Sequence, residues 1–200
     1  AAVKMAPVVG ATVASFDAAN ARGMAGVLDV ADISAALGGE RTGAGAGVAV
    51  IASSWWRAKQ AAAALEVQWN EGAYGKLASE AIFAGFAQAL EQEAGFVYHE
   101  SGSQDAAGAT RTIKAEYRAP FLAHAAMEPV NCTAQVAGGK VRLWASTQVP
   151  SIAVDVAAKV AGVARADVAI EVLLLGGGFG RRLEADMLAQ AVAVAMAAGG

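Results

Sequence analysis

The 200-residue chain is long enough for one large domain or two small ones. Its hydrophobic fraction is 56%, but alanine supplies much of it. A net charge of −3, with charges of both signs scattered along the chain, argues against nucleic acid as a main partner. The longest apolar stretch near the C-terminus, 187–198, is interrupted by Gln190 and is too short to cross a bilayer, so we predict no membrane-spanning segment.

Metal chemistry based on the chain's own side chains is disfavoured. A single cysteine, Cys132, excludes an internal disulfide and any cysteine-ligated iron–sulfur cluster or four-cysteine zinc site. The two histidines, His99 and His124, lack the spacing of a helical zinc motif. We therefore predict no direct metal ligand, so that any metal would have to be carried by a cofactor.

Strands and helices alternate over the first seventy residues, which predicts a compact α/β unit. The expected elements are an extended segment over 3–13, a short helix over 17–24, a strand over 27–33, a loop over 37–47, a strand over 48–52, a helix over 55–65 capped by Ser53 or Ser54, and a strand over 65–69. A polar turn cluster at 70–75 is the best domain boundary.

The remaining residues predict a second mixed unit. The expected elements are a helix over 79–94 with Ile82, Phe83, Phe86 and Leu90 on its apolar side, a loop over 101–108, strands over 110–118, 131–136 and 140–146, a helix from Pro150 to a stop at Gly162, a strand over 168–175, and a helix from about Leu183. The strands over 131–136 and 140–146 form a β-hairpin through a Gly-Gly turn.

The stretch 167–182 (DVAIEVLLLGGGFGRR) is the main candidate for a binding site. A strand that ends in three glycines before a helix start allows backbone N–H groups to approach an anionic or polar ligand. The pair Arg181–Arg182 strengthens the expectation of a phosphate or oxo-anion. A corner that merely allows close packing is an equally good interpretation of this pattern.

Nucleotide motifs do not account for these glycines. Gly176 and Gly178 match the first two positions of Gly-x-Gly-x-x-Gly, but the third falls on Arg181. No Gly-Lys-Ser or Gly-Lys-Thr occurs anywhere in the chain. A second polar candidate, Gln148, follows the hairpin and should lie at the same sheet edge, where ligands collect. The pattern alone favours an ordinary cap-region glutamine there.

Taken together, these stretches resemble the large, molybdenum-binding subunit of the xanthine oxidase (molybdenum hydroxylase) family. The resemblance is carried by 145–150 (ASTQVP), 176–182 (GGGFGRR), 117–120 (YRAP) and the segment from His124 through 127–129 (MEP). The Arg-Arg ending most resembles the isoquinoline 1-oxidoreductase β-subunit and aldehyde oxidase-like branch.

The resemblance implies an α/β (α+β) fold. It places an N-terminally truncated hammerhead-type α/β unit over 1–74, a helix and linker over 75–109, and the first part of a molybdopterin-binding domain over 110–200. Family members are several times longer, so we expect the chain to be a fragment of a larger subunit.

The resemblance also implies roles for individual residues. The expected cofactor-binding set is Gln148, Gly177, Gly178, Phe179, Gly180, Arg181 and Arg182. Gln148 would hydrogen-bond the apical oxygen or sulfur ligand of molybdenum, and Phe179 would shape the substrate cavity. Arg181 and Arg182 would contact the cofactor or a neighbouring domain. Structural roles are expected for His124 and Glu128, and packing roles for Cys132, Trp55 and Trp56.

The implied activity is hydroxylation of an aldehyde or N-heteroaromatic carbon with water-derived oxygen. The implied cofactor is molybdopterin with molybdenum, in the cytosine dinucleotide form, and the implied partner is a small [2Fe-2S] subunit. Leu183 stands where the xanthine-oxidising branch has an acid, so xanthine is disfavoured as a substrate. The general-base glutamate is expected outside this chain, which should therefore be inactive and cofactor-free alone. The alternative is a cofactor-free binding module with the same fold.

Overall fold

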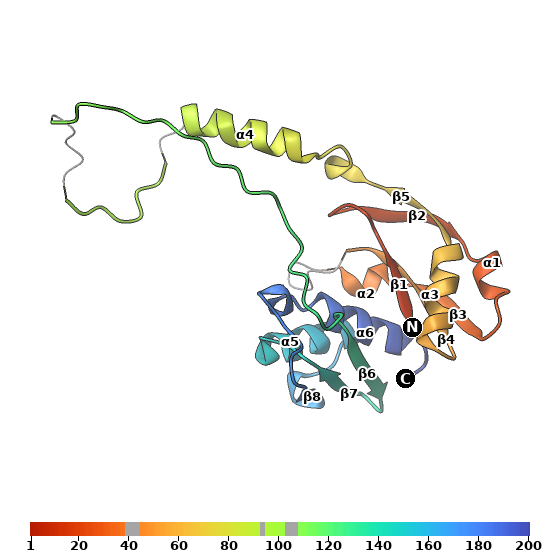
Figure 1. Cartoon of the computed structure of the whole chain (residues 1–200). Coiled ribbons are helices and arrows are strands. Elements are labelled where there is room, and N and C mark those ends of the chain that lie inside the picture. The colour runs from red at the N-terminus through yellow and green to blue at the C-terminus, as the bar shows by residue number, and fades with distance from the viewer. Residues whose placement is uncertain (39–44, 93–94, 103–107) are drawn as a thin grey trace. The chain divides into compact units, whose positions relative to one another are not determined.

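A computed structural model describes residues 1–38, 45–92, 95–102 and 108–200 (Figure 1). The chain forms two compact units. Residues 1–75 and 124–200 together make the first unit, and residues 76–123 make the second. Most of the loop predicted over 37–47 and of the loop predicted over 101–108 lies outside the described residues.

The N-terminal half of the first unit contains two small antiparallel sheets. One has the order β1-β4-β3 and the other pairs β2 with β5. The predicted short helix shrinks to one turn, and β2 was not predicted because its partner strand lies some fifty positions away. The elements are β1 (Ala2–Met5), β2 (Thr12–Asp17), α1 (Ala19–Arg22), β3 (Val27–Asp32), α2 (Ser34–Leu37), β4 (Gly47–Ala52), α3 (Trp55–Ala64), β5 (Glu66–Asn70) and η1 (Gly72–Tyr74).

Helix α3 begins where the sequence predicts but buries a different face. The Ser54 hydroxyl caps it by accepting from the Arg57 N–H at 3.3 Å. The packing role expected for Trp55 and Trp56 is wrong, because each of them is 61% exposed. The buried residues are Ala58 and Ala61, whose small side chains allow α3 to lie close to the sheet.

The C-terminal half of the first unit is a three-stranded sheet, β6-β7-β8, covered by two helices. The β6–β7 hairpin turns through Gly138 and Gly139, both with the positive φ that a tight hairpin turn requires. The strand β8 runs parallel to β7. The elements are β6 (Cys132–Ala137), β7 (Lys140–Ala145), α5 (Pro150–Ala161), η2 (Arg165–Asp167), β8 (Val168–Val172), η3 (Arg181–Leu183) and α6 (Asp186–Ala197).

Two predicted boundaries in this half shift for local reasons. The strand predicted to reach residue 175 ends at Val172, because β7 ends at Ala145 and offers no further partner beyond the Leu173 N–H. The final helix starts at Asp186 rather than near Leu183, because residues 181–183 form the 3₁₀ turn η3 instead of α-helix.

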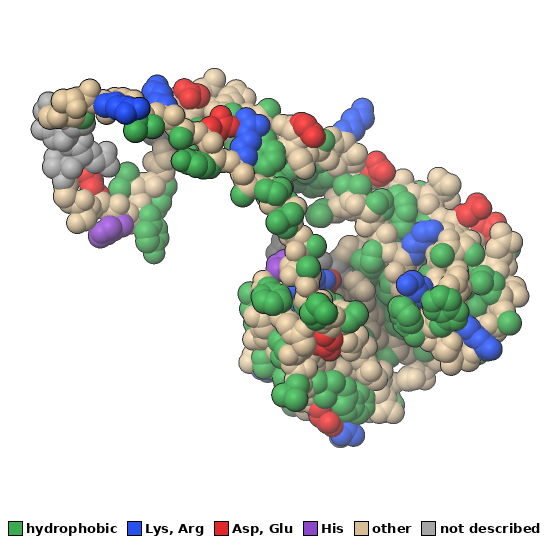
Figure 2. Space-filling view, viewed as in Figure 1, with side chains coloured by type: hydrophobic (Ala, Val, Ile, Leu, Met, Phe, Trp, Pro, Cys, Tyr) green, Lys and Arg blue, Asp and Glu red, His purple; other side chains and the backbone are tan. Residues whose placement is uncertain are grey.

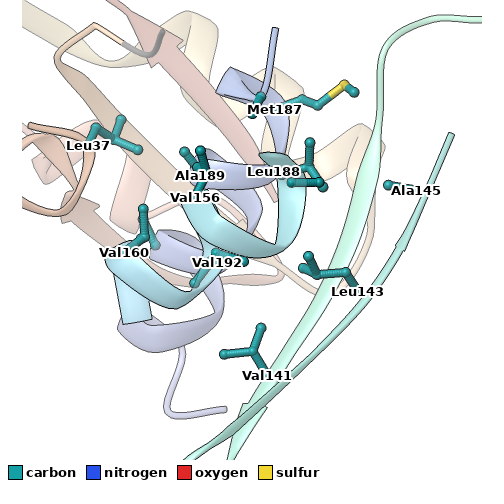
Figure 3. Close-up of a cluster of buried hydrophobic side chains, with 14 of the residues drawn as sticks. Leu37, Val141, Leu143, Ala145, Val156, Val160, Met187, Leu188, Ala189 and Val192 are labelled. Atoms are coloured by element: carbon teal, nitrogen blue, oxygen red, sulfur yellow. The ribbon is translucent and has the colours of Figure 1, made fainter. Parts of the chain in front are cut away.

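The larger hydrophobic cluster of the first unit lies between the β6-β7-β8 sheet and the helices α5 and α6 (Figure 3). Val141 and Leu143 from β7 meet Val156 from α5 and Leu188 from α6. Leu37 of α2 belongs to the same cluster. This cluster therefore joins the two halves of the first unit, and a second, smaller cluster lies within the N-terminal half. Each fully buried aliphatic side chain contributes about 1.5–3 kcal/mol.

The second unit consists of α4 (Ser79–Gln92) and extended segments, with hydrophobic side chains along its surface (Figure 2). None of the described residues of α4 is buried, although Phe83 stacks on Phe121 with ring centroids 6.2 Å apart. The strand predicted over 110–118 is wrong: these described residues pair with no other strand. Their β-favouring side chains lack the partner that a ladder needs. Among the described residues, no helix has the length and apolarity to cross a membrane.

We expect Leu188→Ala to lower the free energy of unfolding by about 2–5 kcal/mol, because it leaves a cavity in a fully buried cluster. Leu174→Ala is the matched control, since Leu174 is 96% exposed, and should change stability by less than about 0.5 kcal/mol. Urea denaturation of both variants measures the difference. Equal effects would contradict the packing described here.

Candidate functional site

Two polar segments meet at one edge of the β6-β7-β8 sheet. Residues 146–148 follow β7, and the glycine loop (residues 176–180) follows β8. Because β7 and β8 are parallel, both segments leave the sheet at the carboxyl ends of the strands, as the sequence predicts.

The glycine loop has an unusual backbone. Gly177, Phe179 and Gly180 have φ values of 105°, 52° and 89°. Phe179 is the notable one, because the left-handed region costs a residue with a Cβ roughly 1–2 kcal/mol. Phe179 is nevertheless 74% exposed, so burial of this residue does not stabilise its conformation. Such strain persists where surrounding contacts fix the backbone, and it is common at ligand sites.

Gln148 lies directly against the glycine loop. A Cβ atom at Gly178 would lie 2.6 Å from Gln148 Oε1, so any other residue at 178 would push the Gln148 amide away from its present position. The Gln148 side chain is exposed, and its amide has no hydrogen bond to any described residue. Its backbone N–H, in contrast, donates to the Arg182 carbonyl at 3.1 Å. The backbone of Gln148 is therefore fixed while its amide is open to a ligand.

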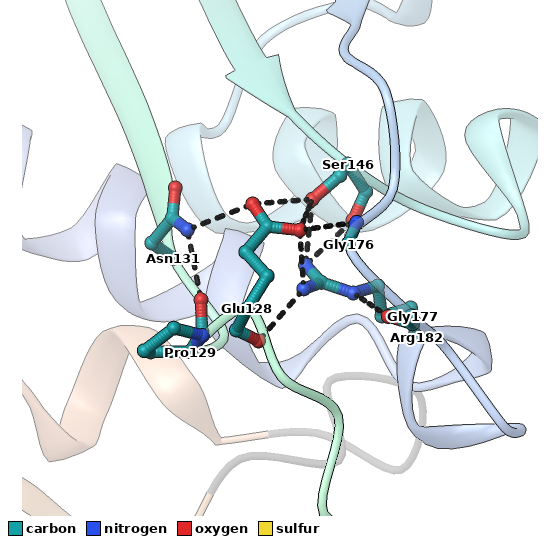
Figure 4. A network of polar contacts seen from close by, with 7 residues as sticks. All are labelled: Glu128, Pro129, Asn131, Ser146, Gly176, Gly177 and Arg182. Carbon is teal, nitrogen blue, oxygen red and sulfur yellow. Dashed lines mark hydrogen bonds and ion pairs between the residues drawn. The ribbon is translucent and has the colours of Figure 1, made fainter.

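Arg182 is fully buried, with none of its surface exposed, and all its donors are engaged (Figure 4). Its Nε donates to the Gly177 carbonyl at 2.8 Å. Its Nη1 donates to Ser146 Oγ at 2.6 Å and to the Ser146 carbonyl at 3.3 Å. Its Nη2 donates to Glu128 Oε2 at 2.7 Å and to the Glu128 carbonyl at 3.1 Å. These five bonds match the five N–H donors of a guanidinium.

Glu128 completes this network from a segment remote in sequence. Its carboxylate accepts from the Gly176 N–H at 2.8 Å, and its own N–H donates to the Gly176 carbonyl at 3.1 Å. The pKa of Glu128 lies below its ordinary value, mainly because its carboxylate accepts the Gly176 N–H. Hydrogen bonds from Asn131 and Ser146 and the positive charge of Arg182 also lower this pKa. Partial burial opposes them by raising this pKa.

Arg181 faces another carboxylate, that of Asp186 at the start of α6. Its Nη1 and Nη2 donate to the two Asp186 oxygens at 2.8 and 2.6 Å. The pKa of Arg181 is raised mainly by this bidentate contact with Asp186. Both arginines of the pair are thus partnered by acids of the same chain.

The sequence alone did not indicate that Glu128 and Asp186 are the partners of the two arginines. Asp186 lies five positions after Arg181, and this spacing matches neither of the i+3 and i+4 spacings at which helical side chains pair. Glu128 is 54 positions from Arg182, and no local pattern links the two residues. The Met-Glu-Pro motif marked Glu128 only as a position of expected structural importance.

No cluster of three or more metal-ligating side chains occurs in the described part of the chain. Cys132 is partly buried and packs against the core. Burial raises the pKa of its thiol to about 12, so it stays protonated at neutral pH. This placement agrees with the packing role expected for Cys132.

The lowered pKa of Glu128 predicts acid sensitivity. Glu128 binds a proton more readily in the unfolded chain than in the folded chain. The stability that its carboxylate contributes is therefore complete above the ordinary carboxyl pKa, and it is lost as the pH falls through the lower pKa of Glu128 in the folded chain. We expect the stability difference between the unmodified protein and Glu128→Gln to be largest near pH 7 and to shrink as the pH falls below about 4. Urea unfolding across this range measures it.

The control for this pH series is Glu171→Gln, which removes an exposed carboxylate from its ion pair with Arg142. An exposed pair contributes little, so this variant should keep most of the pH dependence. A constant difference between the unmodified protein and Glu128→Gln at every pH would contradict the assignment.

Comparison with known proteins gives a family model and two curated relatives. The model of the molybdopterin cofactor-binding domain matches residues 87–199. The chain is 31% identical over 156 residues to the membrane-bound aldehyde dehydrogenase [pyrroloquinoline-quinone] of Gluconacetobacter polyoxogenes, covering 76% of this chain and 20% of that protein. It is 35% identical over 85 residues to the isoquinoline 1-oxidoreductase subunit beta of Brevundimonas diminuta, covering 42% of this chain and 11% of that one.

Solved structures share the fold. Quinoline 2-oxidoreductase from Pseudomonas putida 86 matches 98% of this chain and 30% of its own, with a TM-score of 0.64 and 22% identity. Aldehyde oxidoreductase from Desulfovibrio gigas matches 96% of this chain and 26% of its own, with a TM-score of 0.59 and 17% identity. The expected α/β (α+β) fold is confirmed, and the chain spans a third or less of the length of each of these proteins.

Proposed function

The chain belongs to the molybdopterin cofactor-binding domain family, and we propose that it forms part of the cofactor site of a molybdenum hydroxylase-type oxidoreductase. The observation that carries this proposal is the open amide of Gln148 against Gly178. A neutral donor and acceptor beside a glycine backbone suits an uncharged or anionic oxo-type ligand. The residues present therefore fit the cofactor that the family name specifies.

The proposed contacts use groups that the protein leaves free. Gln148 would hydrogen-bond the cofactor, and Gly177, Gly178 and Gly180 would allow their backbones to approach it. Phe179, with its exposed ring, would line the substrate side. Arg181 and Arg182 belong to this site through the loop that they hold, because their guanidinium groups bind Asp186 and Glu128. When bound, the cofactor supplies two-electron oxidation with oxygen from water.

The proposed substrate class is an aldehyde or an N-heteroaromatic compound. The similar proteins support this class, since they include an aldehyde dehydrogenase, an isoquinoline oxidoreductase and a quinoline oxidoreductase. We further propose a small [2Fe-2S] subunit as electron acceptor, the cytosine dinucleotide form of the cofactor, and a general-base glutamate contributed from outside these 200 residues. The domain division at 74 and 109 stays a proposal of the same kind.

The test is elemental and pterin analysis of the whole protein that contains this chain, expressed with its cofactor-maturation factors. We expect about one molybdenum and one pterin per chain, and neither in the isolated 200 residues.

Gln148→Ala should lower kcat/KM for quinoline or an aromatic aldehyde by about tenfold or more, the loss expected for one hydrogen bond. Gln135→Ala, at an exposed position of β6, is the matched control and should leave kcat/KM unchanged.

Absence of both molybdenum and pterin from the whole protein would contradict the proposal. So would a stoichiometric quinone cofactor in their place, which the name of one relative makes a definite alternative to measure.

A further inference from the structure

The glycine loop needs an external constraint. Gly177, Phe179 and Gly180 all have positive φ. The hydrogen bonds that close local turns lie only at the C-terminal side of the loop: the Arg181 N–H donates to the Gly178 carbonyl and the Leu183 N–H to the Gly180 carbonyl. Its N-terminal side is held by bonds to other segments. Gly176 is bonded on both its N–H and its carbonyl by Glu128, and the Gly177 carbonyl is bonded by Arg182.

Arg182 joins three segments that are far apart in sequence. One guanidinium contacts the glycine loop at Gly177, the end of β7 at Ser146, and the segment before β6 at Glu128 (Figure 4). Because a guanidinium is planar and its donors are arranged in a fixed fork, five simultaneous bonds set the distances and the orientation among these segments. A flexible ammonium group could supply the charge but not this geometry.

The backbone of Arg182 extends the same constraint to Gln148. The Arg182 carbonyl accepts from the Gln148 N–H at 3.1 Å and from Thr147 Oγ1 at 3.3 Å. Thr147 is itself buried and accepts from the Val149 N–H at 3.1 Å. One residue therefore holds the glycine loop with its side chain and the backbone of Gln148 with its carbonyl.

We infer that Arg182 and Glu128 are positioning residues, which preset the glycine loop and Gln148 as one rigid ligand-binding surface before any cofactor arrives. Arg182 presents no free donor to a ligand, because it is buried and its five N–H groups are engaged within the chain. The N–H and the carboxylate of Glu128 are both bonded to Gly176. The inference rests on the proposed function for the identity of the ligand, but not for the rigidity of the loop.

The test is hydrogen–deuterium exchange on the cofactor-free whole protein, produced in cells that cannot make the cofactor. In Arg182→Lys, which keeps the charge and loses the fork, we expect peptides over 173–183 to exchange at least about tenfold faster than in the unmodified protein. Peptides over 188–197 in α6 should be unchanged. Arg142→Lys is the matched control, because Arg142 forms an exposed ion pair with Glu171 on the same sheet, and it should leave the loop unchanged.

A second readout uses the protein expressed with its maturation factors. Arg182→Lys and Glu128→Gln should each retain several-fold less pterin than the unmodified protein, whereas Arg142→Lys should retain as much. Unchanged exchange in the loop would overturn the inference, because Arg182 would then not hold the loop. Exchange that rises equally in the loop and in α6 would also overturn it, because Arg182 would then stabilise the protein as a whole. Unchanged pterin in a variant with a loosened loop would overturn it as well.

These outcomes separate the inference from the proposed function. If the unmodified whole protein holds neither molybdenum nor pterin while Arg182→Lys still loosens only the loop, the proposed function fails and the preset loop stands.

Discussion

The ion pair between the buried Arg182 and the partly exposed Glu128 is the interaction on which the rest of the site depends. A buried guanidinium is costly to desolvate, and it is tolerated only when its charge is paired and its donors are satisfied. Here the carboxylate of Glu128 supplies the charge, and carbonyls of Glu128, Ser146 and Gly177 with the Ser146 hydroxyl supply the remaining acceptors. Removing either partner would leave the other buried or half-buried without compensation.

This arrangement divides the polar groups into two sets. The charged groups face inward and hold the backbone, with Arg181 bound to Asp186 and Arg182 to Glu128. The side chain left open is neutral: it is the Gln148 amide beside Gly178, whereas the carbonyls of Gly177, Gly178 and Gly180 all accept hydrogen bonds within the chain. The left-handed conformation of Phe179, which is unfavourable by itself, becomes possible because both sides of the loop are held.

The sequence predicts most of what depends on short-range chemistry. The Gly138-Gly139 turn, the Ser54 cap and the αL stop at Gly162 are each encoded within a few residues, and the placement of Gln148 beside the glycine loop follows from strand order.

Long-range features were missed because they depend on residues that are far apart in the sequence. The two acids appear in no local pattern that assigns them to the arginines. The exposed Trp55 and Trp56 and the unpaired residues 110–118 show that apolar or β-favouring side chains need a partner surface before they are buried or paired.

The most direct measurement is a crystal structure of the whole protein with its cofactor bound. We expect the Gln148 amide to lie within hydrogen-bond distance of a cofactor atom, while Arg182 keeps its bonds to Gly177, Ser146 and Glu128. A cofactor bound away from the glycine loop, or an Arg182 turned out of its buried position to contact the cofactor, would contradict the account.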